Sequence, residues 1–113
     1  MSYLSIDFGT SAVKVEILGE DLAVLASAKA GYPYMLLPGE KVEIIPEALF
    51  GAAHQACRQL PQELREQVEV LCYDTFSPSP VFIARDGTMA YPNIITHMDR
   101  RSRTITGHID RVV

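Results

Sequence analysis

The sequence contains no tryptophan, only two cysteines and fewer basic than acidic residues, and each scarcity narrows the class of protein. Cys57 and Cys72 lie outside any Cys-x-x-Cys pair or metal-ligand spacing with histidine, which favours reduced, structural thiols in a cytoplasmic protein. The 10 Lys and Arg against 14 Asp and Glu give a net charge of -4, which disfavours nucleic acid or an anionic membrane as a partner. No apolar stretch approaches the roughly 18 residues that a membrane span needs.

The bulk composition is that of a compact globular domain. Hydrophobic residues make up 48% and charged residues 21%, which excludes a disordered, collagen-like or disulfide-dense class. A length of 113 residues suits one domain with a single core. We therefore expect small molecules as ligands.

Alternation of apolar and polar side chains predicts three sequential antiparallel strands, at residues 3–7, 13–18 and 22–30, with a turn at Gly9. Proline and glycine between 31 and 41 predict a surface loop. Pro46 is expected to open a helix that covers the sheet and ends before Pro61. Its apolar face consists of Leu49, Phe50, Ala53, Ala56, Cys57 and Leu60.

Beyond this helix the pattern predicts a short polar helix or turn at 61–67 and strands at 68–73 and 81–84. Ile94 and Ile95 are expected to continue the sheet, and 102–113 are too mixed in pattern for a prediction. The order strand, strand, strand, helix, strand indicates an α/β fold with a ribonuclease-H-like layer, in which antiparallel hairpin strands are covered by a helix.

The segment Asp7-Phe8-Gly9-Thr10-Ser11 has the residue types that a nucleotide phosphate and Mg²⁺ require. Gly9 lets the backbone approach a phosphate, while N–H groups and the Thr10 and Ser11 hydroxyls donate to its oxygens. Asp7 supplies the carboxylate that Mg²⁺ prefers, and Lys14 adds a positive charge. A plain hairpin turn explains the same residues.

The chain resembles the N-terminal segment of the FGGY carbohydrate kinases, the family of glycerol kinase and xylulokinase. The resemblance rests on three motifs in the right order: Ile6 to Ser11 with Lys14, Val42-Glu43-Ile44-Ile45-Pro46-Glu47, and Ile95-Thr96-His97-Met98-Asp99-Arg100-Arg101-Ser102. It implies the N-terminal part of the first lobe of an actin-like ATPase that transfers the ATP γ-phosphate to a sugar or polyol hydroxyl.

By this resemblance five residues contact the ATP phosphates and Mg²⁺, with Asp7 as the metal ligand. They are Asp7, Gly9, Thr10, Ser11 and Lys14.

On the substrate side, Thr75, Phe76 and Ser77 stand where relatives carry Gln-Arg-Glu or Gln-Met-His, so the sugar cannot be named, and loop rigidity is the alternative reading of this stretch. Asp99 and Arg101 match the third motif and are expected to shape the substrate side of the cleft, with a surface salt bridge as the alternative.

The resemblance places the catalytic base, a second phosphate motif and the adenosine pocket beyond Val113. We therefore expect residues 1–113 to be a fragment that is inactive alone. The alternatives are a non-catalytic nucleotide- or sugar-binding module of the same fold, and another actin-like ATPase such as a chaperone or filament protein. The residues at the start of the predicted helix and the sequence Asp99-Arg100-Arg101 argue against a chaperone or filament protein. A homodimer is compatible with the sequence.

Overall fold

The structure, a computed structural model, describes residues 1–112 in two compact units. Unit 1 comprises Met1–Pro33 and Glu47–Phe76, and unit 2 comprises Tyr34–Pro46 and Ser77–Val113. Among the described residues no helix is both long and apolar enough to cross a membrane. The elements in chain order are β1 (Ser2–Phe8), β2 (Ala12–Leu18), β3 (Val24–Gly31), β4 (Met35–Leu37), β5 (Lys41–Ile44), α1 (Pro46–Gln59), α2 (Gln62–Arg65), β6 (Val68–Thr75), β7 (Ile94–Ile95) and α3 (Arg103–Val112).

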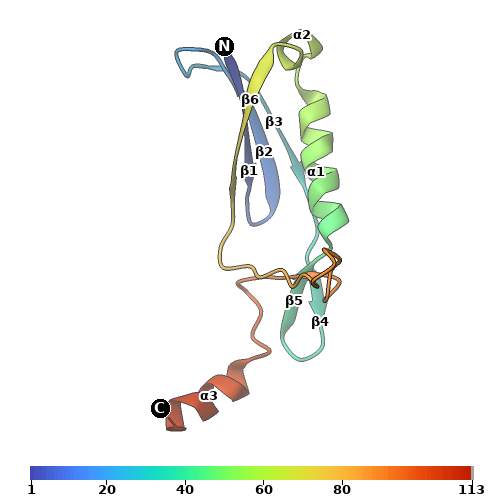
Figure 1. The fold of residues 1–113 in the computed structure, drawn as a ribbon, viewed down its shortest axis with the longest axis vertical. Coiled ribbons are helices and arrows are strands. Elements are labelled where there is room, and N and C mark those ends of the chain that lie inside the picture. Colours follow the sequence, from blue (N-terminus) through green and yellow to red (C-terminus); the bar gives the residue numbers. More distant parts are fainter. Residues whose placement is uncertain (113) are drawn as a thin grey trace. The chain divides into compact units, whose positions relative to one another are not determined.

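Unit 1 is built on a four-stranded sheet of order β3-β2-β1-β6 (Figure 1). The β1–β2 and β2–β3 pairs are antiparallel, so the three sequential strands and the hairpin at Gly9 predicted from the sequence are confirmed. The β6 strand runs parallel to β1. Parallel neighbours need a crossover connection, and the segment that contains α1 supplies it.

The core of unit 1 lies between the sheet and α1. Val13, Val15 and Ile17 of β2 are fully buried. The helix begins at Pro46, as predicted, and buries one face that is mostly alanine. This face consists of Leu49, Ala52, Ala53 and Ala56.

Two details of unit 1 differ from the predictions. Phe50 is 63% exposed instead of buried, although its ring meets Phe8 edge-to-face with 6.0 Å between centroids. The third strand begins at Val24 and not at 22, because Leu22 adopts a φ of 64° and closes a turn in which its N–H donates to the Gly19 carbonyl at 2.9 Å. A residue in this left-handed region cannot continue a strand.

Unit 2 contains a second, three-stranded sheet of order β4-β5-β7. The loop predicted for 31–41 is therefore wrong at β4, which pairs with β5 through a turn where Gly39 and Glu40 have φ values of 84° and 58°. Ile94 and Ile95 do form a strand, but it pairs with β5 and does not extend the four-stranded sheet. The strand predicted at 81–84 is reduced to one bridge between Ile83 and Met89.

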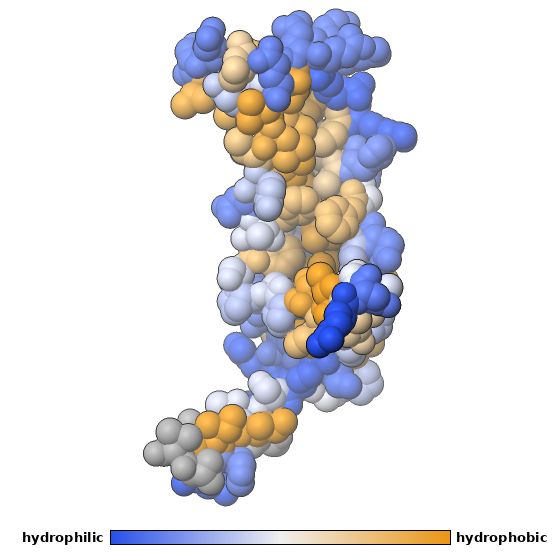
Figure 2. Space-filling view, in the orientation of Figure 1, coloured by the Kyte–Doolittle hydropathy of each residue, from blue (hydrophilic) through white to orange (hydrophobic). Residues whose placement is uncertain are grey.

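Apolar side chains come to the surface of unit 1 beside β6 and α1 (Figure 2). Within the described residues β6 is an edge strand, since its only partner in the sheet is β1. Leu71 and Tyr73 of this strand are 56% and 72% exposed. An open edge with apolar side chains is the kind of surface that proteins normally cover.

We expect Ile17→Ala to lower the free energy of unfolding by about 2–5 kcal/mol, because it removes buried methyl and methylene groups and leaves a cavity. The matched control is Ile83→Ala, since Ile83 is 63% exposed and loses little burial. Urea denaturation followed by circular dichroism measures both. Equal effects of the two substitutions would contradict the placement of the core.

Candidate functional site

The turn between β1 and β2 is closed by the backbone of Gly9. Its N–H donates to the Ala12 carbonyl at 3.0 Å. A Cβ added at Gly9 would lie 2.9 Å from the same carbonyl oxygen, a distance that real Cβ atoms do not tolerate. The close approach of the two backbone segments therefore requires glycine at this position, and the predicted turn is confirmed as a tight one.

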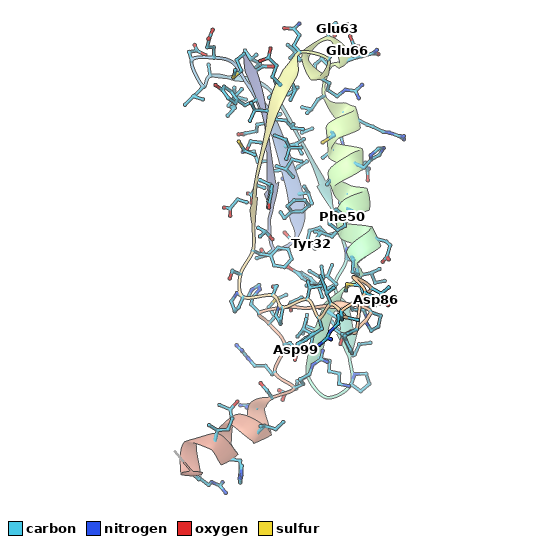
Figure 3. The ribbon with its side chains drawn as sticks, viewed as in Figure 1. Tyr32, Phe50, Glu63, Glu66, Asp86 and Asp99 are labelled. Atoms are coloured by element: carbon cyan, nitrogen blue, oxygen red, sulfur yellow. The ribbon has the colours of Figure 1, made fainter. Side chains whose placement is uncertain are left out.

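Tyr32 holds the carbonyl side of this turn. Its hydroxyl donates to the Gly9 carbonyl, and its own N–H donates to the Ser11 carbonyl at 3.3 Å. The Tyr32 side chain, labelled in Figure 3, is only 7% exposed. By contrast, the N–H groups of Thr10 and Ser11 have no acceptor among the described residues, and both residues are exposed. The turn thus leaves donors available to an anion.

Charged residues form a row across the sheet next to this turn. Asp7 of β1 lies opposite Lys14 of β2 and opposite Asp74 of β6. All three are exposed. The Lys14 ammonium pairs with the Glu16 carboxylate at 2.9 Å, and this hydrogen bond raises the pKa of Lys14. An exposed pair of this kind is weak because water screens it, so Lys14 remains available to a phosphate.

Asp7 and Asp74 are exposed carboxylates at register positions of the neighbouring strands β1 and β6. Register partners on neighbouring strands present their side chains on the same face, and Mg²⁺ is commonly bound by one or two carboxylates together with phosphate oxygens and water. Among the described residues no group of three or more His, Cys, Asp or Glu side chains could hold a metal ion. Two carboxylates suit Mg²⁺ only where phosphate or water oxygens complete its coordination. Asp74 was missed from the sequence because the β1–β6 register is a long-range pairing.

The structure brings two of the predicted substrate residues to the end of β1. Thr75 is the register partner of Phe8, and the Phe76 N–H donates to the Phe8 carbonyl at 3.0 Å. Ser77 begins the second segment of unit 2. Thr75 and Phe76 thus stand beside the strand that leads into the Gly9 turn.

In unit 2 the predicted residues Asp99 and Arg101 belong to a network centred on a buried carboxylate. Glu43 of β5 is fully buried, and three donors reach its two oxygens. The distances are 2.5 Å from the Tyr91 hydroxyl, 2.8 Å from the Asn93 amide and 2.5 Å from the Arg101 guanidinium. A buried charge is tolerated only when it is paired and hydrogen-bonded, and Glu43 meets both conditions.

Asp99 (labelled in Figure 3) accepts hydrogen bonds from the same guanidinium group of Arg101. Its oxygens accept from Nε and Nη2 of Arg101 at 2.8 and 2.6 Å, from the Arg101 N–H at 3.0 Å and from the Val42 N–H at 2.7 Å. The fork of Arg101 is therefore occupied by Asp99 and Glu43 inside unit 2, which makes this more than an exposed salt bridge.

The electrostatics of the network follow from these bonds. Hydrogen bonds from Arg101, with a smaller opposing effect of burial, hold the pKa of Asp99 well below its usual 3.8. Burial raises the pKa of Glu43, but the hydrogen bonds from Tyr91, Asn93 and Arg101 outweigh it and leave that pKa below its usual value. The bonds to Asp99, Tyr91 and Glu43 raise the pKa of Arg101. All three groups are charged at neutral pH.

Sequence reasoning found Asp99 and Arg101 but missed the role of Glu43 and its partners Tyr91 and Asn93. A glutamate between Val42 and Ile44 is the available signal, because a charged residue inside an apolar strand is rarely buried without a partner. His97 is half-buried, and its Nδ1 is buried without a hydrogen-bond partner among the described residues.

The chain resembles solved structures of sugar and polyol kinases over almost its whole length. It matches gluconate kinase from Lactobacillus acidophilus with a TM-score of 0.86 and 21% identity, over 97% of this chain and 22% of that one. For xylulose kinase from Rhodospirillum rubrum the TM-score is 0.81 at 18% identity, over 100% and 24%. For Plasmodium falciparum glycerol kinase with ADP it is 0.75 at 18%, over 97% and 23%.

These likenesses establish the fold of the chain. It has a mixed α/β fold shared with xylulose, gluconate and glycerol kinases, so the resemblance to FGGY carbohydrate kinases predicted from the sequence is confirmed at the level of the fold. The chain spans less than a quarter of the length of these kinases. Neither a protein-family profile nor a curated protein sequence matches it.

We expect Gly9→Ala to destabilise the protein by about 1–3 kcal/mol, because the new Cβ collides with the Ala12 carbonyl. The matched control is Gly51→Ala in α1, where a Cβ meets nothing within 4 Å and alanine is the better helix former. That control should stabilise by up to about 1 kcal/mol. Thermal unfolding of both variants tests the turn, and a neutral Gly9→Ala would contradict the close approach.

We expect Asp99→Asn to lower the free energy of unfolding at pH 7 by about 2 kcal/mol, since it removes the charge that Arg101 binds. Because the pKa of Asp99 is lowered in the folded protein, its contribution is complete well above 3.8 and is lost as the pH falls below that value. The gap between wild type and variant should therefore shrink from about pH 4 downward. Denaturant titrations from pH 7 to pH 2 measure it, with Glu63→Gln as the exposed control, and a gap independent of pH would refute the pairing.

Proposed function

We propose that the chain is the N-terminal part of the first lobe of an ATP-dependent FGGY carbohydrate kinase, a protein with a ribonuclease-H-like, actin-like fold. The parent transfers the γ-phosphate of ATP to a hydroxyl of a sugar or polyol in the cytoplasm. The observation that carries this proposal is the match of the whole chain to gluconate, xylulose and glycerol kinases, together with a tight glycine turn that keeps two backbone donors open.

The Gly9 turn is the phosphate-binding element in this proposal. The N–H groups and hydroxyls of Thr10 and Ser11 donate to phosphate oxygens, and Gly9 allows the backbone to come close to them. Lys14 leaves its exposed pair with Glu16 to offset phosphate charge. Phosphoryl transfer depends mainly on positioning and on charge stabilisation, which are the two properties that this turn supplies.

Asp7 is the metal ligand in this proposal, and Asp74 is its neighbour on β6. Mg²⁺ bound there would neutralise charge on the nucleotide phosphates. The two carboxylates would hold the ion near the end of β1, and Lys14, opposite Asp7 on β2, would add a second positive charge for the phosphate oxygens.

In this proposal Thr75 and Phe76 of unit 1, and Ser77, Asp99 and Arg101 of unit 2, are each assigned a contact with the substrate. Phe76 offers an aromatic face to a sugar ring, and Thr75 and Ser77 offer hydroxyls. Arg101 is fixed by Asp99, Glu43 and Tyr91, which leaves one Nη1 hydrogen held in one orientation for a neutral hydroxyl. Rigid donors of this kind discriminate among polyols by the position of their hydroxyls.

A non-catalytic nucleotide- or sugar-binding module of the same fold is the competing function, because the chain spans less than a quarter of the kinases it matches. The open edge of β6 supports the kinase proposal, since a longer protein would supply a neighbouring strand for its unpaired backbone groups. The coding sequence beyond Val113 decides between them. A second lobe with another glycine-rich phosphate turn and a catalytic aspartate supports the kinase, and a stop codon there refutes it.

In the full-length protein we expect Asp7→Asn to lower kcat on the order of a hundredfold while KM for the sugar changes less than about threefold. The reason is that Asp7 acts on the metal and the transferred phosphate and not on the sugar. A coupled assay of ADP release over a panel of polyols and ketoses measures both constants. Asp21→Asn, in the turn between β2 and β3, is the control and should leave them unchanged. Equal losses in kcat and sugar affinity would refute the role of Asp7.

A further inference from the structure

We infer that Tyr32 is a positioning residue of the phosphate turn, and that its hydroxyl aims the Thr10 N–H at the bound phosphate. The inference deepens the proposed kinase function and rests on it. It starts from two contacts made by one buried side chain and its backbone: the Tyr32 hydroxyl donates to the Gly9 carbonyl, and the Tyr32 N–H donates to the Ser11 carbonyl.

The geometry of the peptide group turns the first contact into an orientation of the turn. The Gly9 carbonyl and the Thr10 N–H belong to one planar, trans peptide unit, in which the C=O and N–H bonds point in opposite directions. When Tyr32 draws the Gly9 carbonyl toward the protein, the Thr10 N–H must point away from it. The Thr10 N–H accordingly has no acceptor among the described residues.

The second contact works in the same way on the peptide unit two further along the turn. The Ser11 carbonyl accepts from the Tyr32 N–H at 3.3 Å, so the Ser11–Ala12 peptide is also held in one orientation. The Ser11 N–H between these two fixed units is likewise without an acceptor. Tyr32 therefore fixes the peptide that carries the Thr10 N–H and also the two peptides that flank the one carrying the Ser11 N–H.

Tyr32 is suited to this role because its side chain is buried. Its side chain is 7% exposed, and the strand β3 ends one residue before it at Gly31. Gly9, by contrast, has no side chain to restrict its peptide, and glycine peptides change orientation more easily than others. A hydrogen bond from a rigid neighbour is what keeps such a peptide in one orientation before a ligand arrives.

The experiment compares wild type, Tyr32→Phe and the control Tyr73→Phe in the full-length protein. Phenylalanine keeps the buried ring and removes only the hydroxyl, while Tyr73 is 72% exposed on β6 of the same sheet. We expect Tyr32→Phe to lower kcat/KM for ATP roughly fivefold to tenfold, the usual effect of one lost hydrogen bond, with KM for the sugar unchanged. The Thr10 amide signal in a ¹⁵N–¹H spectrum should shift and broaden in this variant, and its shift on addition of ADP and Mg²⁺ should become smaller.

The outcomes separate the inference from the function on which it rests. The inference is overturned if the wild type is active and Tyr32→Phe changes neither kcat/KM for ATP nor the Thr10 amide signal. That outcome leaves the kinase proposal standing. Equal losses for ATP and sugar with a lower melting temperature assign Tyr32 a purely structural role and also overturn it. A wild type that phosphorylates no polyol or ketose overturns both. A selective loss for ATP, with Tyr73→Phe unchanged, supports the inference.

Discussion

The tight closure of the β1–β2 hairpin at Gly9 is the constraint on which unit 1 depends. With the Gly9 N–H bonded to Ala12 and no room for a Cβ, the turn has one length, and this length fixes the pairing of Asp7 with Lys14. In a sheet, a shift by one residue would move every side chain to the opposite face. The same closure therefore buries Val15 against the helix side and leaves the charged pair in solvent.

Unit 2 is held together by a different kind of interaction. Its buried apolar side chains are few, with Ile44 and Ile94 the clearest, and a fully buried carboxylate lies among them. Glu43, Asp99 and Arg101 join β5 to the segment after β7, which the short strands alone would connect weakly. A network of this kind adds little net stability compared with apolar packing, but it tolerates only one arrangement because any unpaired charge would be buried.

The sequence predicted those parts of the fold that depend on neighbouring residues. The alternation in β1 and β2 and the proline at the start of α1 are local signals, and both were confirmed. The β4–β5 hairpin was missed because Gly39 looks like a loop residue, although its φ of 84° is what turns the chain. The partner of β7 was wrong because an apolar dipeptide does not indicate which strand it will join.

The candidate site likewise has one part that neighbouring residues predict and another that depends on long-range contacts. The residue types around Gly9 could be read from the sequence, yet the same residues also suit a plain hairpin, because a motif does not state the direction of its peptide groups. That direction depends on Tyr32, 23 residues away from Gly9 in sequence, and on the β1–β6 register that places Asp74 beside Asp7. Both are long-range contacts that only the folded chain creates. A phosphate-binding turn therefore differs from an ordinary turn in the orientation of two peptide groups. The buried hydroxyl of Tyr32, the residue that follows β3, is enough to orient one of them.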